Sequence, residues 1–450
     1  MTSSESVQLL RLFQKAAPPS FFEEVGQEQD CHFRRGVYSM MVVVWLMIWQ
    51  RLQRQRSLVA AVQCLLQGPA GVLLSSCKRV EQDKISAATG GYCQARQKLP
   101  QRIVIQVSDR IVEQLRREMQ EGRPGLGCPF FLIDGSSLQL SYTPELAQRF
   151  SPGRNQYGSN HWPVLKVVVF HDVFSGLALR PSWGPMYGPQ AVSEQSLAQQ
   201  ALQRLPPNAG VLADCNFGIF AFAWVVGQSQ RPMIFRLSKP RAQKILGTPL
   251  LPGTDRKMIW RASDWDRKHH PELPPDAALE GRLLVCKNPS RTDDLLYLWT
   301  TLDLPAAEIL ELYGLRWNIE TDLRSLKQTV GLEQLSSRSP EMIEKELLLA
   351  VTAYNLVRAV MCLAARRIGV EPRRLSFSFT QSVVEAALPG LDQATSESEY
   401  GYRLERLLRY AAQGKLPKRS RKRSYSRQIW GRSEDFPRRK RGSENAGSLQ

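Results

Sequence analysis

The chain has 450 residues, of which 43% are hydrophobic and 23% charged, so it can build at least one full-sized core and is neither disordered nor fibrous. Its 60 Lys and Arg against 42 Asp and Glu give a net charge of +18, which indicates a polyanionic partner, either nucleic acid or an anionic membrane surface. Eight scattered cysteines without a C-x-x-C pair favour reduced thiols in a cytoplasmic protein over disulfides or a zinc site.

Residues 1–120 are expected to form an α-helical domain. Apolar residues recur every three or four positions in Leu58–Leu66 and Ile103–Met119, without the alternation of a strand. The apolar run Val37–Trp49 is flanked by arginines and is shorter than the roughly 20 residues that a membrane-spanning helix needs. We therefore interpret this run as a buried helix.

Strand signals begin after residue 120. The order of elements predicted for residues 121–230 is two strands, a third short strand, a helix, a strand and a helix: Phe130–Asp134, Val164–Phe170, Leu177–Arg180, Ser193–Leu205, Gly210–Asp214 and Phe217–Val226. This order predicts an α/β fold with a sheet of mixed strand directions.

The pattern changes again at residue 231. Residues 231–302 are rich in proline and basic residues and hold two strand candidates, Arg282–Cys286 and Leu295–Leu302, so we expect a β-containing basic insertion. Residues 303–375 return to long helical patterns, from Pro305 to Gln328 and from Glu341 to Arg367.

Residues 376–450 form a C-terminal region with a basic tail. Lys415–Arg441 holds twelve Lys and Arg against two acidic residues. Such a run is typical of a disordered segment that binds polyanions without sequence preference, and the alternative is a solvated tail with no function.

The helix around Glu320 presents two different faces. At 100° per residue, an arc of about 80° holds Tyr313, Arg316, Glu320, Arg324 and Lys327, and leucines and Ile319 form the apolar face beside it. Asp322 falls about 160° from Glu320, so we expect it to stay out of any site there and its change to Asn to leave cleavage normal.

Two apolar strands upstream each end in a carboxylate, Asp134 and Asp214. Together with Glu320 they provide the oxygen ligands that two Mg²⁺ ions need for in-line phosphoryl transfer, and the surrounding cations suit DNA phosphates. The alternative for Glu320 is an exposed helix with i,i+4 ion pairs such as Glu320–Arg324. That alternative does not explain the two strand-end aspartates.

The spacing Tyr313-x2-Arg316-x3-Glu320-x6-Lys327 resembles the signature of DDE transposases, in the branch of bacterial insertion-sequence transposases with a β-rich insertion before the catalytic Glu. Four further segments resemble the same family, two of them around the aspartates: Ile133–Ser136, Leu212–Phe217, Tyr92–Leu99 and Tyr354–Arg358. Cys215-Asn216 departs from the basic residue and glycine usual after the second Asp.

The resemblance implies a ribonuclease-H-like core that carries out cut-and-paste transposition of an insertion sequence. Asp134, Asp214 and Glu320 would be catalytic and bind two Mg²⁺ ions, for which Mn²⁺ would substitute. Tyr313, Arg316 and Lys327 would contact DNA, and Arg324 joins them by its place on the helix. The implied partners are double-stranded DNA, at terminal inverted repeats and target, and a second copy of the chain in a synaptic homodimer. The resemblance also implies that the helical domain of residues 1–120 binds DNA, and that the protein works in the bacterial cytoplasm at the nucleoid.

Two other functions stay open at this point. One is a structure-specific nuclease on the same fold that cuts without joining. The other is a catalytically inactive, transposase-derived DNA-binding regulator, against which the three intact acidic residues argue. The resemblance also implies an aromatic from the insertion that stacks a flipped base; Tyr297 and Trp299 are candidates, although a core position suits both as well.

Overall fold

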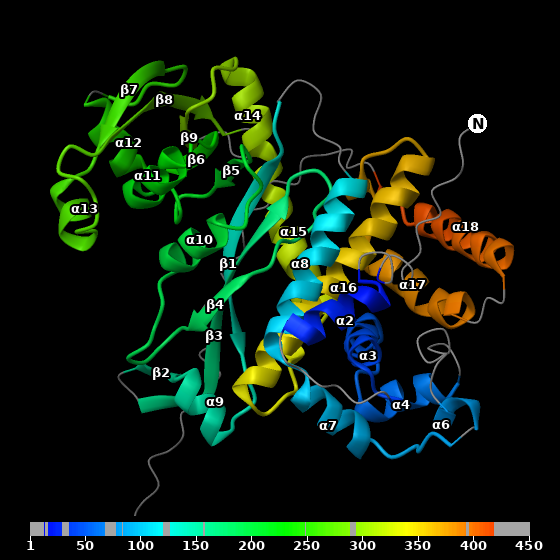
Figure 1. Ribbon diagram of the computed structural model, residues 1–450. Coiled ribbons are helices and arrows are strands. Elements are labelled where there is room, and N and C mark those ends of the chain that lie inside the picture. The colour runs from blue at the N-terminus through cyan, green and yellow to red at the C-terminus, as the bar shows by residue number, and fades with distance from the viewer. Residues whose placement is uncertain are drawn as a thin grey trace, which may run out of the picture.

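The computed structural model describes residues 13, 17–28, 36–67, 78–82, 84–119, 127–155, 158–247, 249–288, 294–392 and 396–417, so most of the basic tail lies outside the described residues. The described part up to residue 119 holds helices and no strand, as the apolar spacing predicts (Figure 1). These helices are α2 (Pro19–Glu28), α3 (Met40–Leu52), α4 (Leu58–Leu66), α6 (Lys78–Glu81), α7 (Gly90–Lys98) and α8 (Gln101–Glu118).

The apolar run around residue 45 is a buried helix, α3. Ser39 caps its first turn, where the Ser39 hydroxyl accepts a hydrogen bond from the Val42 N–H at 3.4 Å. α3 packs on α16 (Pro340–Arg367), which runs through the centre of the helical part (Figure 1). α16 is long and apolar enough to cross a membrane, but 94% of its most apolar window is buried inside the protein, as in the core helix of a globular protein.

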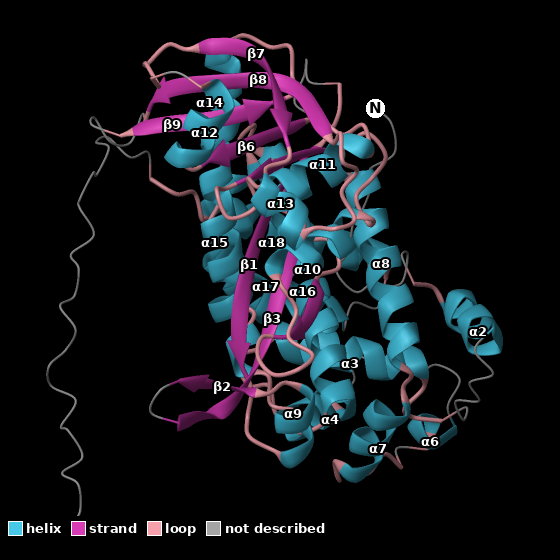
Figure 2. Ribbon diagram, turned by 90° about the vertical axis from the view of Figure 1, so that its left-hand side faces the viewer, coloured by secondary structure: helices cyan, strands magenta, loops and turns pink. Residues whose placement is uncertain are grey.

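The nine strands of the described residues form one mixed sheet in the order β2-β3-β1-β5-β6-β9-β8-β7, with β4 paired to β3. Figure 2 shows β7, β8 and β9 at one end of the molecule and β2 at the other. The strands are β1 (Phe130–Gln139), β2 (Pro152–Asn155), β3 (Gly158–Asp172), β4 (Ser182–Pro185), β5 (Gly210–Ala213), β6 (Met233–Leu237), β7 (Asp255–Arg261), β8 (Ala278–Lys287) and β9 (Leu295–Thr300).

The centre of this sheet has the strand order β4-β3-β1-β5-β6. β3 runs antiparallel to both β4 and β1, whereas β5 and β6 run parallel to β1. Three antiparallel strands followed by two parallel ones form the ribonuclease-H-like core, so the expected α/β fold with a mixed sheet is confirmed.

Alternate residues of β1 face different helices. Phe131 and Ile133 share a buried cluster with α10 (Glu194–Leu202) and α11 (Phe220–Gln228) on one face of the sheet. Phe130 and Leu132 share another cluster with α14 (Ala306–Gly314) and α15 (Asn318–Arg324) on the opposite face. Because side chains alternate along a strand, Asp134 lies on the face of α14 and α15 and Gly135 on the face of α10.

The segment expected as an insertion continues the central sheet. β9 pairs antiparallel with β6, and β8 and β7 follow. β6, which falls inside the segment expected from residue 231, is itself the second parallel strand of the core. Only short helices interrupt these strands, consistent with the prolines: α12 (Lys239–Leu246) and α13 (Asp264–His269). Trp299 is fully buried and its ring packs against Trp260 at 5.3 Å, so in this structure it is a core residue and does not face DNA.

One predicted strand, Leu177–Arg180, is wrong. The third antiparallel strand is β4, and residue 178 forms only an isolated bridge to His171. Both backbone polar groups of Ala178 bond to the Asn355 side chain of α16, each at 2.8 Å. A side-chain amide therefore takes the place of the neighbouring strand here.

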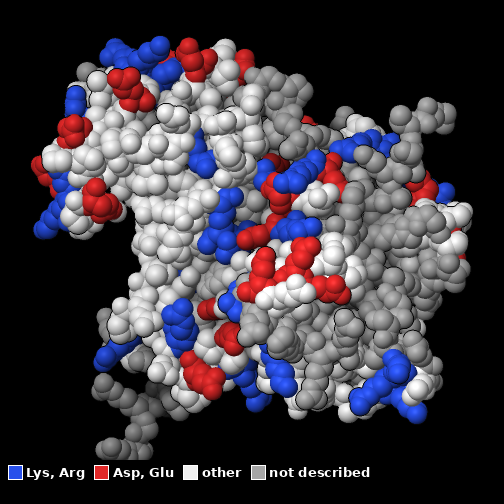
Figure 3. All heavy atoms as spheres, in the orientation of Figure 1, with Lys and Arg blue, Asp and Glu red and all other residues white. Residues whose placement is uncertain are grey.

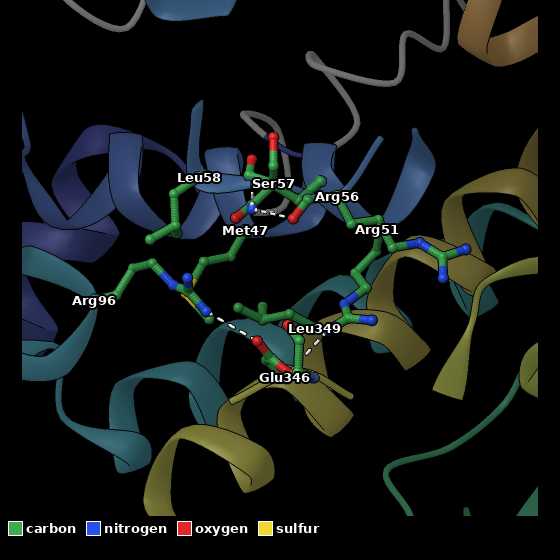
Figure 4. Close-up of a pocket in the computed structure, with 10 residues that line it drawn as sticks. Met47, Arg51, Arg56, Ser57, Leu58, Arg96, Glu346 and Leu349 are labelled. Atoms are coloured by element: carbon green, nitrogen blue, oxygen red, sulfur yellow. Dashed lines mark hydrogen bonds and ion pairs between the residues drawn. The ribbon is translucent and has the colours of Figure 1, made fainter. Parts of the chain in front are cut away.

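The N-terminal helices join α16 through a buried acidic residue. Glu346 on α16 pairs with Arg51 of α3 at 2.9 Å and with Arg96 of α7 at 3.0 Å, beside a cavity of about 120 Å³ (Figure 4). Tyr92 is fully buried and donates a hydrogen bond to Gln50 at 2.8 Å. The segment Tyr92–Leu99 therefore places these two family-like residues, Tyr92 and Arg96, in the helical core.

The remaining described elements complete the shell around the sheet and α16. They are α9 (Pro144–Arg149), the short turns η1 (Leu315–Trp317), η2 (Ser325–Thr329), η3 (Leu332–Gln334) and η4 (Pro372–Arg374), and the C-terminal helices α17 (Phe377–Asp392) and α18 (Glu397–Gln413).

Candidate active site

Asp134 and Asp214 lie on neighbouring parallel strands at the same level. β1 and β5 pair through Leu132 and Leu212, and each aspartate follows two residues after its member of that pair. Residues two apart on a strand point to the same face, and neighbouring strands lie about 4.8 Å apart. The structure therefore brings the two carboxylates together on the face covered by α14 and α15, although β1 continues to Gln139 and only Asp214 follows the end of its strand.

The surroundings of Asp134 disfavour its charged form. Burial raises the pKa of the Asp134 carboxyl to about 6, and the negative charges of Asp214 and Glu194 act in the same direction. The Gly135 N–H, which donates to Asp134 at 2.8 Å, and the Arg316 guanidinium oppose this rise in pKa. Several acidic groups and one arginine thus act on a single half-buried carboxylate.

Glu320 reaches this centre through Arg316. The helix predicted from Pro305 to Gln328 is interrupted: α14 passes through a 3₁₀ turn, η1, into α15, and a π-helical turn, η2, follows. Arg316 on η1 pairs with Glu320 on α15 at 3.5 Å, and the same arginine acts electrostatically on Asp134. The departures from α-helical geometry at η1 and η2 therefore do not separate Arg316 and Glu320 from the aspartates.

Tyr313 is a buried residue of α14 and not an exposed one. Its side chain is 6% exposed, and its hydroxyl has no hydrogen-bond partner among the described residues. Burial raises the pKa of Tyr313 to about 12, against the attraction of Arg316 and Arg236. The sequence pattern does not single out Arg236, whose signal is a single basic residue in the apolar strand β6, on the face where Ile234 packs.

Arg324 and Lys327 extend the basic side of this helix. Arg324 is exposed at the end of α15. Lys327 lies in the π-helical turn and pairs with Glu333 at 3.0 Å. A π turn holds more than 3.6 residues, so the arc calculated at 100° per residue does not apply beyond Arg324. In this structure Lys327 is therefore bound to an acidic neighbour rather than to Glu320.

The donor set at this centre suits a hard divalent cation. All of its candidate ligands are carboxylate oxygens, and Asp134 and Asp214 repel each other at a half-buried position that a cation would neutralise. Among the residues that the structure describes, no three His, Cys, Asp or Glu side chains lie close enough together to hold a metal ion. Glu320 is turned toward Arg316, so it would leave that ion pair to bind a metal.

Asp322 lies on the other side of α15, as its position on the helix predicts. It is fully buried and pairs with Arg358 of α16 and, at 2.9 Å, with Arg373 of η4. The two guanidinium groups hold the pKa of Asp322 below its usual range against its burial. Asp322 therefore fastens the helix of Glu320 to the core.

His171 completes this buried cluster, and its titration is expected to affect stability. It faces Asp322 on α15 at 3.8 Å, Tyr354 and Arg358 on α16, and Arg373 on η4. Burial lowers the pKa of His171 to about 4, because the two arginines offset much of the attraction of Asp322.

A histidine whose pKa is depressed in the fold contributes stability that is present above about pH 6.5 and is lost as the pH falls through about 4. We expect the free energy of unfolding of the intact chain to fall across this window by up to about 1.4 kcal/mol per pH unit more than that of His171→Asn. Urea unfolding of both proteins between pH 8 and 4.5 measures the two slopes. Equal slopes would show that His171 does not titrate in this way.

Three comparisons place these features among known proteins. Residues 127–356 match the family described as transposase DDE domain. The chain is 27% identical over 414 residues to the transposase InsG for insertion sequence element IS4 of Escherichia coli (strain K12), which covers 90% of this chain and 88% of that protein. A solved piggyBac transposase synaptic complex with hairpin DNA is 12% identical, covers 92% of this chain and 86% of that chain, and gives a TM-score of 0.42.

Proposed function

This chain belongs to the transposase DDE domain family and is a DNA transposase, and we propose that it moves an insertion sequence by cut-and-paste transposition. The observation that carries the proposal is the placement of Asp134 and Asp214 at one level of the sheet, with Arg316 and Glu320 beside them. Enzymes of this family work with divalent metal ions. We propose two Mg²⁺ ions here, held by Asp134, Asp214 and Glu320, with Mn²⁺ as a substitute.

When bound, the ions would activate the attacking oxygen and stabilise the leaving oxygen of an in-line displacement at phosphorus. The residues of the chain prepare this step by position. Asp134 lies in β1 and Asp214 directly follows β5, so the pairing of these two strands, which ends two residues earlier, sets the level of both side chains. The Glu320 carboxylate would leave its ion pair with Arg316 to bind a cation beside the two aspartates. The released guanidinium would then be free to bind a phosphate of the scissile strand.

The remaining DNA contacts are proposed for the same helix. The Tyr313 hydroxyl lies near Arg316 and has no hydrogen-bond partner among the described residues, so it can donate to a phosphate oxygen once that arginine turns. Arg324 is exposed and Lys327 needs only to leave Glu333. The space-filling view shows a hollowed edge between the parts that hold α13 and β2, next to the place where Figure 1 draws α10 (Figure 3).

The proposed reaction has four steps. Water attacks the phosphodiester at the element end and frees a 3′-OH; this hydroxyl attacks the opposite strand, which forms a hairpin and releases the flanking DNA. A second water opens the hairpin, and the 3′ ends then attack target DNA and join it with release of a target 3′-OH. The helical part up to residue 120 and a second copy of the chain would hold the two terminal inverted repeats in a synaptic homodimer. We place the reaction in the bacterial cytoplasm, at the nucleoid.

A strand-transfer assay tests this proposal against a nuclease and against an inactive DNA-binding regulator. Labelled DNA that carries the inverted repeats flanking the coding region is incubated with the full chain, Mg²⁺ and a supercoiled target. A transposase nicks intact ends and joins pre-cut 3′ ends to the target. Cutting without joining would indicate a nuclease, and binding without either reaction would indicate a regulator.

A further inference from the structure

A fourth carboxylate reaches the reaction centre from the opposite face of the sheet. Glu194 is the first residue of α10, which Ser193 caps by accepting a hydrogen bond from the Ser196 N–H at 3.0 Å. Its carboxylate fills the space where residue 135 would carry a side chain: a Cβ on Gly135 would lie 2.5 Å from Glu194 Oε1. The absence of a side chain at residue 135 thus lets Glu194 lie against β1 beside Asp134.

The strand edge at this point is open. β5 ends at Ala213, and its pairing with β1 ends at Leu132, so none of the described strands pairs with β1 on that side at residue 134. Asp134 approaches from the face of α15 and Glu194 from the face of α10, and the negative charge of Glu194 acts on Asp134.

The start of α10 also contacts the loop of the second aspartate. Gln195 donates from its side-chain amide to the Asn216 carbonyl at 3.5 Å. Asn216 in turn donates its backbone N–H to the Asp214 carboxylate at 2.9 Å. One helix end is therefore tied to both strands of the centre, which fixes the place of Glu194 relative to Asp134 and Asp214.

The carboxylate of Glu194 is not engaged in an ion pair of the fold. Among the described residues it has no hydrogen-bond or ion-pair partner for its carboxylate, whereas Glu320 pairs with Arg316 and Glu346 pairs with two arginines. An unpaired carboxylate whose charge acts on a second, half-buried carboxylate is unfavourable, since like charges repel. The helix N-terminus offsets only part of this repulsion.

We propose that Glu194 is a fourth acidic ligand of the reaction centre and binds a divalent cation together with Asp134, with Gly135 as the residue that admits it. The proposal rests on the proposed function, because it assigns a further residue to the same centre. A fourth carboxylate raises the negative charge at Asp134 and so favours occupancy of the cation there at low metal concentration.

Manganese binding to the full chain without DNA, followed by electron paramagnetic resonance at pH 8, tests this ligand directly. We expect Glu194→Gln, which keeps the size of the side chain and removes its charge, to weaken binding of Mn²⁺ by about tenfold. Gly135→Ala should weaken it similarly, because the added methyl displaces the carboxylate. The matched control is Glu145→Gln in the first turn of α9, an exposed residue, which should bind Mn²⁺ as the unchanged chain does.

DNA cleavage supplies a second readout. For Glu194→Gln the Mg²⁺ concentration that gives half-maximal nicking should rise by about the same factor, while thermal unfolding without metal shows that the variant is folded. Unchanged Mn²⁺ binding by Glu194→Gln, with binding lost in Asp134→Asn, would overturn the assignment of Glu194 and leave the proposed function intact. Unchanged binding in both variants would overturn the acidic metal centre itself.

Discussion

Asp134→Asn, Asp214→Asn and Glu320→Gln should each lower DNA nicking by about 10²–10³-fold or more, while DNA binding stays close to that of the unchanged chain. Each change replaces one carboxylate of the centre by an amide of the same size and removes none of the basic residues that hold phosphates. Nicking of labelled element ends in Mg²⁺ and a gel-shift titration with the same DNA measure the two effects. Asp276→Asn, at an exposed position, is the control and should cut normally.

Near-normal nicking by any one of these three variants would remove that residue from the catalytic group. Unfolding is a second explanation for lost activity, and the metal-free stability of Asp134→Asn separates the two. The pKa of Asp134 is raised in the fold to about 6 from 3.8, so the stability it contributes is complete below pH 3.8 and is lost as the pH rises through about 6. At pH 8 the variant should be more stable than the unchanged chain by roughly 1–3 kcal/mol, a gain that shrinks toward pH 5.

The positions of the two aspartates follow from local pattern, which is why the sequence predicts them. Phe130–Leu132 and Gly210–Leu212 are short apolar runs, and an apolar run that ends in a carboxylate places the charge where burial ends. The fold class follows in the same way from the order of strands and helices. Neither inference needs a contact between distant segments.

Helical periodicity predicts less about the signature helix, because it assumes one constant turn. The 3₁₀ turn at Leu315–Trp317 and the π turn at Ser325–Thr329 each change the rotation per residue, so the relative directions of Tyr313, Glu320 and Lys327 depart from the wheel. Arg316 and Glu320 remain together because only four residues separate them.

Long-range packing decides the features that sequence pattern misses. Nothing local in Ser193-Glu194 indicates that this helix start lies against Gly135, since the approach depends on how α10 crosses the sheet. The same holds for Asn355, which bonds to Ala178 and ends the predicted strand there. Such side chains act through partners that are distant in sequence, and a single sequence carries no signal for those pairs.

Asp322 shows most clearly how partners distant in sequence change the expected effect of a substitution. Its position on the helix correctly predicts that it stays away from the aspartates, but the conclusion that Asp322→Asn behaves normally does not follow. The carboxylate is fully buried between Arg358 and Arg373. Arg358 donates to Tyr354, whose hydroxyl donates to the Gly176 carbonyl at 2.9 Å, and Arg373 donates to the Val173 carbonyl at 2.7 Å. One carboxylate thus joins α15 to α16, to η4 and to the turn after β3.

We expect Asp322→Asn to lower the free energy of unfolding by about 3–5 kcal/mol, because it leaves two guanidinium groups in the core without their carboxylate. Urea unfolding at pH 7.5 measures this loss. Arg373→Gln should lose less, since Asp322 then keeps Arg358, and the double variant Asp322→Asn/Arg373→Gln should be more stable than the sum of the two single effects. Additive effects, or an Asp322→Asn variant as stable as the unchanged chain, would contradict this assignment.

The same variant separates a positioning role from a catalytic one. Asp322 touches neither aspartate in this structure and acts on Glu320 only through the placement of α15, so its loss should not change the metal dependence of the reaction. At a temperature where Asp322→Asn is folded, we expect nicking to persist at a reduced rate with the same half-maximal Mg²⁺ concentration. Nicking by Asp322→Asn should disappear on warming, when the variant unfolds. Glu320→Gln should stay inactive at every temperature, because its folded state lacks the carboxylate itself.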